Sequence, residues 1–368
     1  MRVVVEDNEA VWQIAVATNR NLNGSGVNLP PVPSNLSLAK QAQLAKNQTG
    51  STTFGFCSVH VPTSRPRGLC EVGRRSADIR VDSFSSTTET TFVRSLRESL
   101  KATDNPNVLV FVHGFNVSFE DSLARTAQLA NDMPFGGLIV GFSWASSGDV
   151  GSVLVNHRYA HDEQIAERYF WSLGQLLVQL RKELPKTARI HLLAHSMGNR
   201  VALRALNALA GRLSPTGAEV FMNHRELAKT HPNWSRWSED KIDNPVLSEV
   251  VFAAPDVASS EFKRFVQNAA HIAERMTLYT SDIDVALEGS LKYHQQGYRA
   301  GDSRAHIQIP GLRVVHTSRV SRLDPLGHSY YGSDPQVLDN LAILFQVDEE
   351  QVRTMTLADF GSSFSSRN

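Results

Sequence analysis

The stretch that decides the fold of this chain is residues 189–211, which read RIHLLAHSMGNRVALRALNALAG. Its first seven residues are a short apolar run, as expected for a strand that is buried on both faces. Small and apolar residues then recur at helical spacing, and Ala202, Ala205 and Ala208 leave that helix thin enough to pack close to a sheet. The sequence therefore predicts a strand that passes directly into a helix at Ser196.

The junction itself, AHSMG at 194–198, has the pattern of a nucleophile elbow, with alanine at the first small position. A serine on so sharp a turn needs small residues two positions away on either side. The turn lifts the hydroxyl above the sheet at the start of a helix, where the Met197 N–H and the helix dipole favour an oxyanion. We predict Ser196 as a nucleophile; the alternative is a helix N-cap, a position that serine also favours.

A second stretch, GFSWA at 141–145, fits the same pattern and also follows an apolar run. Ser143 leads into SSGDVGS, a loop sequence, so it lacks the helix that the elbow requires. We interpret Ser143 as a strand-end residue.

Segments that alternate between strand-like and helix-like patterns surround the elbow. Strands are predicted at 11–18, 54–62, 108–113, 137–142, 189–195, 247–254, 275–281 and 311–317, and helices at 92–102, 118–133, 159–183, 197–211 and 335–346. Residues 21–52 are polar and are predicted as a long loop, in which AKQAQLAKNQ (39–48) could form a short helix, and a second polar stretch covers 75–91. Such alternation predicts a mostly parallel sheet covered by helices on both faces. Together with the elbow, it predicts an α/β-hydrolase fold with an N-terminal strand extension.

The pattern shows no linker between domains after residue 107. We predict a single domain over 1–348, with N-terminal strands and loops at 1–106 and a catalytic core at 107–348. Residues 212–246 form a long insertion in that core, and 349–368 form a C-terminal tail. The insertion follows the far end of the elbow helix, so we expect an interface or packing element, through which the chain could form a homo-oligomer, in preference to a lid.

The strand at 108–113 ends in His113 and Gly114 and is followed by a helix. In the predicted fold, the loop at this place supplies a second N–H group to the oxyanion hole. We assign that role to Phe115, beside Met197, because Gly114 lets the backbone turn towards the site. His113 is expected to shape the loop without transferring protons.

The order of a triad in this fold is serine, then acid, then histidine. Of the histidines late in the chain, His328 lies on a glycine-containing turn between the last strand and the last helix, where the base is expected. Three aspartates follow strand ends and could orient it. Asp284 is preferred, and Asp256 and Asp282 remain alternatives; each could instead cap a helix.

Composition excludes several classes of function. The 368 residues carry 37 basic and 37 acidic side chains, and this balance gives no indication of binding to nucleic acid. Cys57 and Cys70 are the only cysteines, too few for a disulfide scaffold; we expect both to be reduced, and a single disulfide between them is the alternative in an oxidising compartment. The N-terminus does not resemble a secretory signal and no apolar run is long enough to span a membrane, so we expect a cytoplasmic protein. No cofactor or metal is predicted.

The chain resembles a bacterial family of α/β hydrolases of unknown function over nearly its whole length. The resemblance rests on ATNRNL (17–22), FGFCSVHVP (54–62), VFVHGFNVSFEDSL (110–123), VGFSWAS (140–146), LLAHSMGNR (192–200), LYTSDIDVAL (278–287) and LGHSYY (326–331). It implies a triad of Ser196, Asp284 and His328, and N-terminal strands that belong to the same domain. Family members often have proline where Ala145 stands, which puts the shape of the 143–158 loop in doubt.

These residues favour a carboxylic-ester hydrolase that acts on a small-molecule ester. An acyltransferase or thioesterase would use the same triad, and a catalytically silent scaffold is the third reading. The loops beyond the strand ends carry aromatic and apolar residues, of which we expect Phe119, Trp144, Tyr330 and Tyr331 to contact the substrate. An apolar acyl or alcohol part is expected, unless Arg299 or Arg304 brings positive charge to the site.

Overall fold

The structure is a computed structural model. It describes residues 3–6, 8–20, 49–73, 78–103, 105–148, 155–168, 170–210, 245–295, 297–317 and 323–346. The predicted tail (349–368) lies outside these ranges. So do all but two residues of the predicted insertion (212–246) and most of the predicted loop at 21–52.

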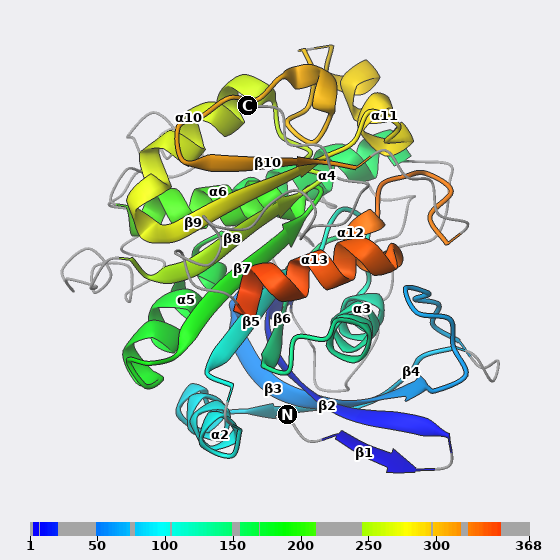
Figure 1. Ribbon diagram of the computed structural model, residues 1–368, viewed down its shortest axis with the longest axis vertical. Coiled ribbons are helices and arrows are strands. Elements are labelled where there is room, and N and C mark those ends of the chain that lie inside the picture. The colour runs from blue at the N-terminus through cyan, green and yellow to red at the C-terminus, as the bar shows by residue number, and fades with distance from the viewer. Residues whose placement is uncertain are drawn as a thin grey trace.

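The described strands form one twisted sheet in the order β10-β9-β8-β7-β5-β6-β2-β3-β4, with β1 paired to β2 (Figure 1). Six strands run parallel to their neighbours: β5 (Asn107–Val112), β6 (Leu138–Ser143), β7 (Arg189–His195), β8 (Leu247–Ala253), β9 (Ala273–Thr280) and β10 (Leu312–His316). Every residue of β5, β6 and β8 is buried, as the continuous apolar runs predict. The α/β-hydrolase fold expected from the sequence is confirmed.

The N-terminal strands extend this same sheet. They are β1 (Val3–Glu6), β2 (Glu9–Arg20), β3 (Thr49–Pro62) and β4 (Arg80–Thr87). β2 runs parallel to β6, with Ala15 opposite Val140, and β3 and β4 then add antiparallel strands. Neither β1 nor β4 is among the strands predicted from the sequence. β4 reads RVDSFSST and lies at the sheet edge, and such a mostly exposed strand lacks the apolar run that marks a buried one.

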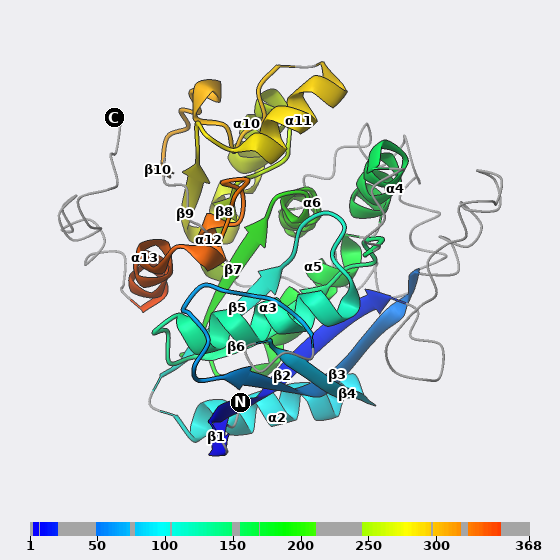
Figure 2. The ribbon, with the colours of Figure 1, turned by 90° about the vertical axis from the view of Figure 1, so that its right-hand side faces the viewer.

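Helices cover both faces of the sheet (Figures 1 and 2). One face carries α2 (Glu89–Lys101), α4 (Val155–Arg168), α5 (Trp171–Glu183), α6 (Gly198–Leu209) and α10 (Ser259–Ala269). α6 contacts α4, α5 and α10, and α5 contacts α2. The other face carries α3 (Phe119–Asp132), α12 (Tyr330–Ser333) and α13 (Pro335–Gln346). The remaining helical segments are α11 (Val285–His294) and the 3₁₀ turns Ala270–Ile272 and Ser303–Ala305.

The single long helix predicted over 159–183 is corrected to two helices, because α4 ends at Arg168 and α5 begins at Trp171. Both halves contact α6, and α5 also contacts α2. Apolar residues recur at helical spacing on both sides of the break, so periodicity alone does not reveal it.

No helix in the described ranges is both long enough and apolar enough to cross a membrane. The carboxyl ends of the parallel strands meet at one edge of the sheet, where ligands of open α/β sheets bind. β5 ends before His113, β7 before Ser196, β8 before Asp256, and β9 before Asp284.

Candidate active site

Ser196 lies on a strained turn between β7 and α6. Its φ is 52°, a left-handed value that is uncommon for any residue other than glycine. The neighbouring strand holds the turn in place, since the Ser196 N–H donates to the Ala253 carbonyl oxygen (3.0 Å) and the Ser196 carbonyl accepts from Asp256 N (3.2 Å). The geometry matches that of a nucleophile elbow, with the side chain facing a cavity.

Two glycines allow the chain to approach this turn closely. A Cβ atom at Gly198 would lie 2.3 Å from the His113 carbonyl oxygen, and one at Gly114 would lie 3.0 Å from the Ser196 Cβ. The start of α6 can therefore lie this close to the loop after β5 because Gly198 has no side chain, and a side chain at Gly114 would crowd Ser196.

His328 and Asp284 form a buried pair beside this turn. The His328 Nδ1–H donates to the Asp284 Oδ2 over 2.7 Å. The other oxygen of Asp284 accepts from Leu287 N (2.9 Å), so the aspartate also caps α11. Asp284 thus makes both of the contacts considered for it: one oxygen caps α11 and the other accepts from His328.

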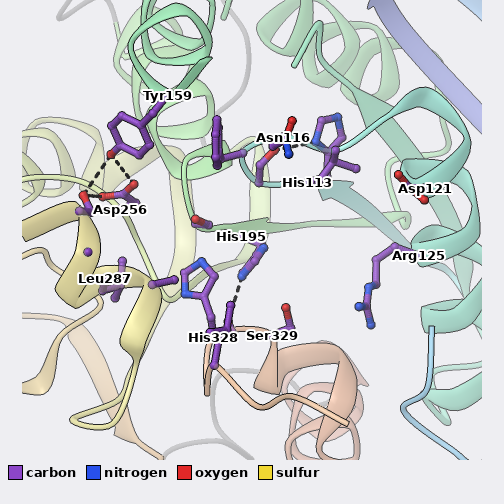
Figure 3. Close-up of a pocket in the computed structure, with 18 of the residues that line it drawn as sticks. His113, Asn116, Asp121, Arg125, Tyr159, His195, Asp256, Leu287, His328 and Ser329 are labelled. Carbon is purple, nitrogen blue, oxygen red and sulfur yellow. Dashed lines mark hydrogen bonds between the residues drawn. The ribbon is translucent and has the colours of Figure 1, made fainter. Parts of the chain in front are cut away.

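Two further contacts hold the loop that carries His328. The Nε2–H of His195 donates to the His328 carbonyl oxygen (3.0 Å), and Asp324 accepts from Ser329 N (2.6 Å). Figure 3 shows the rings of His195 and His328 side by side, and their centroids are 4.7 Å apart. In the described part of the chain, no hydrogen bond joins Ser196 to His328. Such bonds are often long before substrate binds.

Neighbouring groups shift the pKa values of the two histidines in opposite directions. Burial by itself lowers the pKa of His328, but the negative charge of Asp284 and its hydrogen bond outweigh burial, so the pKa is raised above 6.5. Burial and the charge of His328 hold the pKa of His195 well below 6.5. His195 therefore stays neutral, and His328 is the histidine suited to accept a proton.

The N–H groups of Phe115 and Met197 are candidates for an oxyanion hole. Neither has a hydrogen-bond partner among the described residues, and Met197 stands at the N-terminus of α6. His113, just before this loop, is buried, and burial together with the charge of Arg20 lowers its pKa to about 3. Its ring stacks on Trp144, whose indole N–H donates to the His113 carbonyl oxygen (2.7 Å).

Arg20, the last residue of β2, fastens the loop after β5 from the opposite side. Its guanidinium donates to the Val117 carbonyl oxygen (2.7 Å), the Ser146 carbonyl oxygen (2.8 Å) and the Ser143 Oγ (2.9 Å). Sequence reasoning missed this role, because the contacts join residues more than ninety positions apart.

The alternatives considered in the sequence are engaged elsewhere. Ser143 is 1% exposed and hydrogen-bonds to Arg20 and to the Ser122 Oγ (2.8 Å). Asp256 accepts from Arg299 (2.8 Å) and Ser290, and also bonds Tyr159. Burial by itself would raise the pKa of Asp256, but the nearby charges of Arg299 and Arg200 keep it below its ordinary value.

A cavity of about 670 Å³ opens above the strand ends, and Ser196, His328 and Phe115 line it. Its walls are mainly apolar and aromatic, with Tyr159, Leu287 and Tyr293 at one end. Figure 3 shows Tyr159 and Asp256 on one side of His195, and Arg125 and Asp121 on the other. Among the described residues, no group of three or more histidine, cysteine, aspartate and glutamate side chains could hold a metal ion.

Of the four expected substrate contacts, Tyr331 alone lines the cavity. Phe119 packs edge-on against Phe84, and Trp144 stacks on His113. Tyr330 is 1% exposed and donates to the Tyr279 carbonyl oxygen (3.0 Å). Their expected role as substrate contacts is therefore corrected: these three aromatic rings fill the core under the loops.

Arg299 and Arg304, which were expected to bring positive charge to the site if the pocket is not apolar, do not line the cavity. Arg299 is buried against Asp256, and Arg304 pairs with Asp302. Two side chains that sequence reasoning missed do line it: Arg125, on α3, and Tyr159, on α4. Neither has a motif around it, and only its position on a helical face could have indicated a role.

The sheet order, the strained serine between strand and helix, and the paired His328 and Asp284 together define the α/β-hydrolase class. Residues 88–346 match a family described as "Alpha/beta hydrolase of unknown function (DUF900)". The match spans well over half of the chain, so the chain belongs to this family, which confirms the resemblance seen in its sequence. Strands β1–β4 precede the matched residues.

No curated protein matches the chain. Among solved structures, an arylesterase is 10% identical, with 79% of this chain and 81% of that chain covered and a TM-score of 0.32. Esterase B from Lactobacillus rhamnosis is 11% identical, with 81% and 80% covered and a TM-score of 0.31. A metagenomic carboxyl esterase is 13% identical, with 66% and 75% covered and a TM-score of 0.29. Superpositions this weak carry no argument about activity.

Proposed function

We propose that the protein is a serine hydrolase that cleaves carboxylic esters through Ser196, His328 and Asp284. The observation that carries the proposal is the 2.7 Å hydrogen bond between His328 and Asp284. His328 lines the same cavity as Ser196, which lies on a strained turn. A histidine held by a carboxylate and a serine at a helix N-terminus are the parts that acyl transfer needs.

The first half of the reaction forms an acyl-enzyme. His328 Nε2 takes the proton of the Ser196 hydroxyl as its oxygen attacks the ester carbonyl carbon. The negative carbonyl oxygen that forms accepts from the N–H groups of Phe115 and Met197. When the intermediate collapses, the bond to the alcohol breaks and His328 returns the proton to the departing oxygen.

Water completes the reaction by the same route. His328 removes a proton from water as that water attacks the acyl-enzyme, and the carboxylic acid leaves as Ser196 regains its proton. Asp284 keeps the Nδ1–H of His328 directed at itself, so that Nε2 is free to accept, and it stabilises the imidazolium. The volume and apolar walls of the cavity suit a small or medium ester.

Fluorophosphonate labelling tests the proposal directly. We expect the purified protein to be labelled at Ser196, as read by mass spectrometry of the modified peptide, and to hydrolyse p-nitrophenyl esters of graded chain length. Ser196→Ala should lose both properties. A folded wild-type protein that is neither labelled nor active on any ester would refute the proposal. Faster release of p-nitrophenol when an acceptor alcohol is added, with ester formed in place of acid, would replace hydrolysis by acyl transfer.

A further inference from the structure

Arg125 places a positive charge at one end of the active-site cavity. It lies on α3, lines the cavity and is partly exposed there. Figure 3 shows it on the side of His195 opposite to Tyr159 and Asp256. An arginine stays protonated at any pH that the protein meets. Among the described residues that line the cavity, Arg125 is the one arginine or lysine.

The guanidinium is held in place by neutral groups. Its Nη1–H donates to the Gln128 Oε1 (2.9 Å), and its central carbon lies 5.7 Å from the centre of the Tyr331 ring. Gln128 is itself fixed, since its Nε2 donates to the Asp132 Oδ2 (2.8 Å) and the Gly332 carbonyl oxygen (2.9 Å). This support fixes the direction of the side chain in advance of any ligand, which lowers the entropy lost on binding.

The charge of Arg125 is not neutralised by an ion pair within the described residues. The carboxylates around it have other partners. Asp132 accepts from Arg65 and from Gly68 N (2.8 Å), and Asp324 accepts from Ser329 N. Asp121, one helical turn away on the exposed rim, accepts from the Ser118 hydroxyl (2.6 Å). A partly exposed guanidinium with no contacting carboxylate in the described chain is free to bind an anion that a ligand brings.

The position of Arg125 relates that ligand to the reacting centre. The Tyr331 ring lies between Arg125 and the nucleophile turn, and its centre is 4.3 Å from that of His195. An anion bound by Arg125 would thus lie one aromatic ring away from the residue that precedes Ser196. Tyr159 and Leu287 line the side of the cavity away from Arg125 (Figure 3), together with Asp256, whose charge is paired with Arg299.

We propose that the substrate is an ester that carries a carboxylate, which Arg125 binds while the uncharged part of the ester lies towards Tyr159. This inference rests on the proposed function. A carboxylate fits better than a dianionic phosphate, because Asp121 also lines this end of the cavity and would repel a second negative charge. The guanidinium can hold both carboxylate oxygens at once.

Matched pairs of esters test the proposal. The acyl arm compares mono-p-nitrophenyl glutarate with p-nitrophenyl pentanoate. The alcohol arm compares the butyrate esters of 4-hydroxyphenylacetate and of its methyl ester. We expect kcat/KM to be at least tenfold higher for the charged ester in one arm. Arg125→Gln should lower the ratio of charged to neutral ester by about ten- to a hundredfold, and Arg125→Lys by less. Arg304→Gln, which removes an arginine that does not line the cavity, should leave both rates unchanged.

The inference is overturned if the wild type cleaves charged and neutral esters equally well in both arms, or if Arg125→Gln leaves the ratio unchanged. Cleavage of the neutral ester that depends on Ser196 would leave the proposed function standing in either case. If no ester is cleaved, the proposed function fails, and binding then tests only whether Arg125 holds a carboxylate. Calorimetry on Ser196→Ala should then show pentanoate bound at least tenfold more tightly than pentanamide, and that preference should vanish with Arg125→Gln. Equal binding of the two would reject it.

Discussion

Two serines in this protein share a sequence pattern and differ in everything around them. Ser143 ends β6, pairs across to Thr18 of β2 and is hydrogen-bonded to Arg20. Ser196 leaves β7 at a φ of 52° and enters α6 within two residues. Small neighbours therefore permit a sharp turn but do not create one. The helix that follows immediately makes the difference, because it forces the chain to reverse at the serine and aligns N–H groups beside its hydroxyl.

The largest effect should separate these two serines. If the proposed function holds, Ser196→Ala should lower kcat for a p-nitrophenyl ester by about 10⁶-fold, as removal of the nucleophile does in triad enzymes. Ser143→Ala should keep most of the activity, because it loses only hydrogen bonds at a strand end. Ester turnover of both variants measures this, with near-ultraviolet circular dichroism as the control for folding. A folded but inactive Ser143→Ala would break the comparison.

The next largest effect should separate two buried carboxylates on the Ser196 side. Asp284→Asn leaves His328 without the acceptor that fixes its tautomer and should lower kcat by about 10⁴-fold. Asp256→Asn disturbs a network with Arg299 and Tyr159 and should cost much less activity. The kcat values of the two variants are the measurement. Equal and modest losses would place the triad acid elsewhere.

A smaller effect is expected on the Ser143 side, through Arg20. Arg20→Met removes the hydrogen bonds to the Val117 and Ser146 carbonyl oxygens, which hold the loop that carries Phe115. We therefore expect kcat to fall by about ten- to a hundredfold with little change in KM. Affinity for a boronic acid, which mimics the tetrahedral intermediate, should fall in parallel.

Loss of stability alone would leave that affinity unchanged in the folded fraction, and this outcome would make Arg20 purely structural. Lysine should not restore the activity, because a single ammonium group cannot reach three acceptors in the fork geometry of arginine. The double variant with Ser143→Ala should be no worse than Arg20→Met, if Ser143 acts only through Arg20.

The smallest effect is a shift in a pH profile. The base must be neutral to take the serine proton, so kcat/KM should fall as the pH drops through the raised pKa of His328, with a midpoint above 6.5. Asp256→Asn should move that midpoint slightly downward, because its charge adds to the raising effect of Asp284.

The Ser143→Ala variant should keep the wild-type midpoint. In Ser196→Ala protein, NMR titration of His328 should show the same raised pKa, and adding Asp284→Asn should lower it further than Asp256→Asn does. A midpoint at or below 6.5 in the wild type would contradict the assignment of His328.

Much of the architecture was accessible from the chain alone. Continuous apolar runs marked the buried strands β5–β9, and the junction at Ser196 indicated the fold, because both features are local in sequence. Strand β4 was not predicted, because an exposed edge strand has no apolar run. The division into α4 and α5 was not predicted either, because apolar residues recur at helical spacing in both helices.

The sequence by itself determined the order of serine, aspartate and histidine and the small residues that the turn requires. Only the tertiary structure decided which aspartate faces His328, that Arg20 reaches the loop after β5, and that Arg125 lines the cavity. The tertiary structure also shows that Phe119, Trp144 and Tyr330, which were expected to contact the substrate, pack in the core. The reason is physical: backbone conformation follows from near neighbours, whereas a site at the strand ends depends on side-chain directions from elements far apart in the chain.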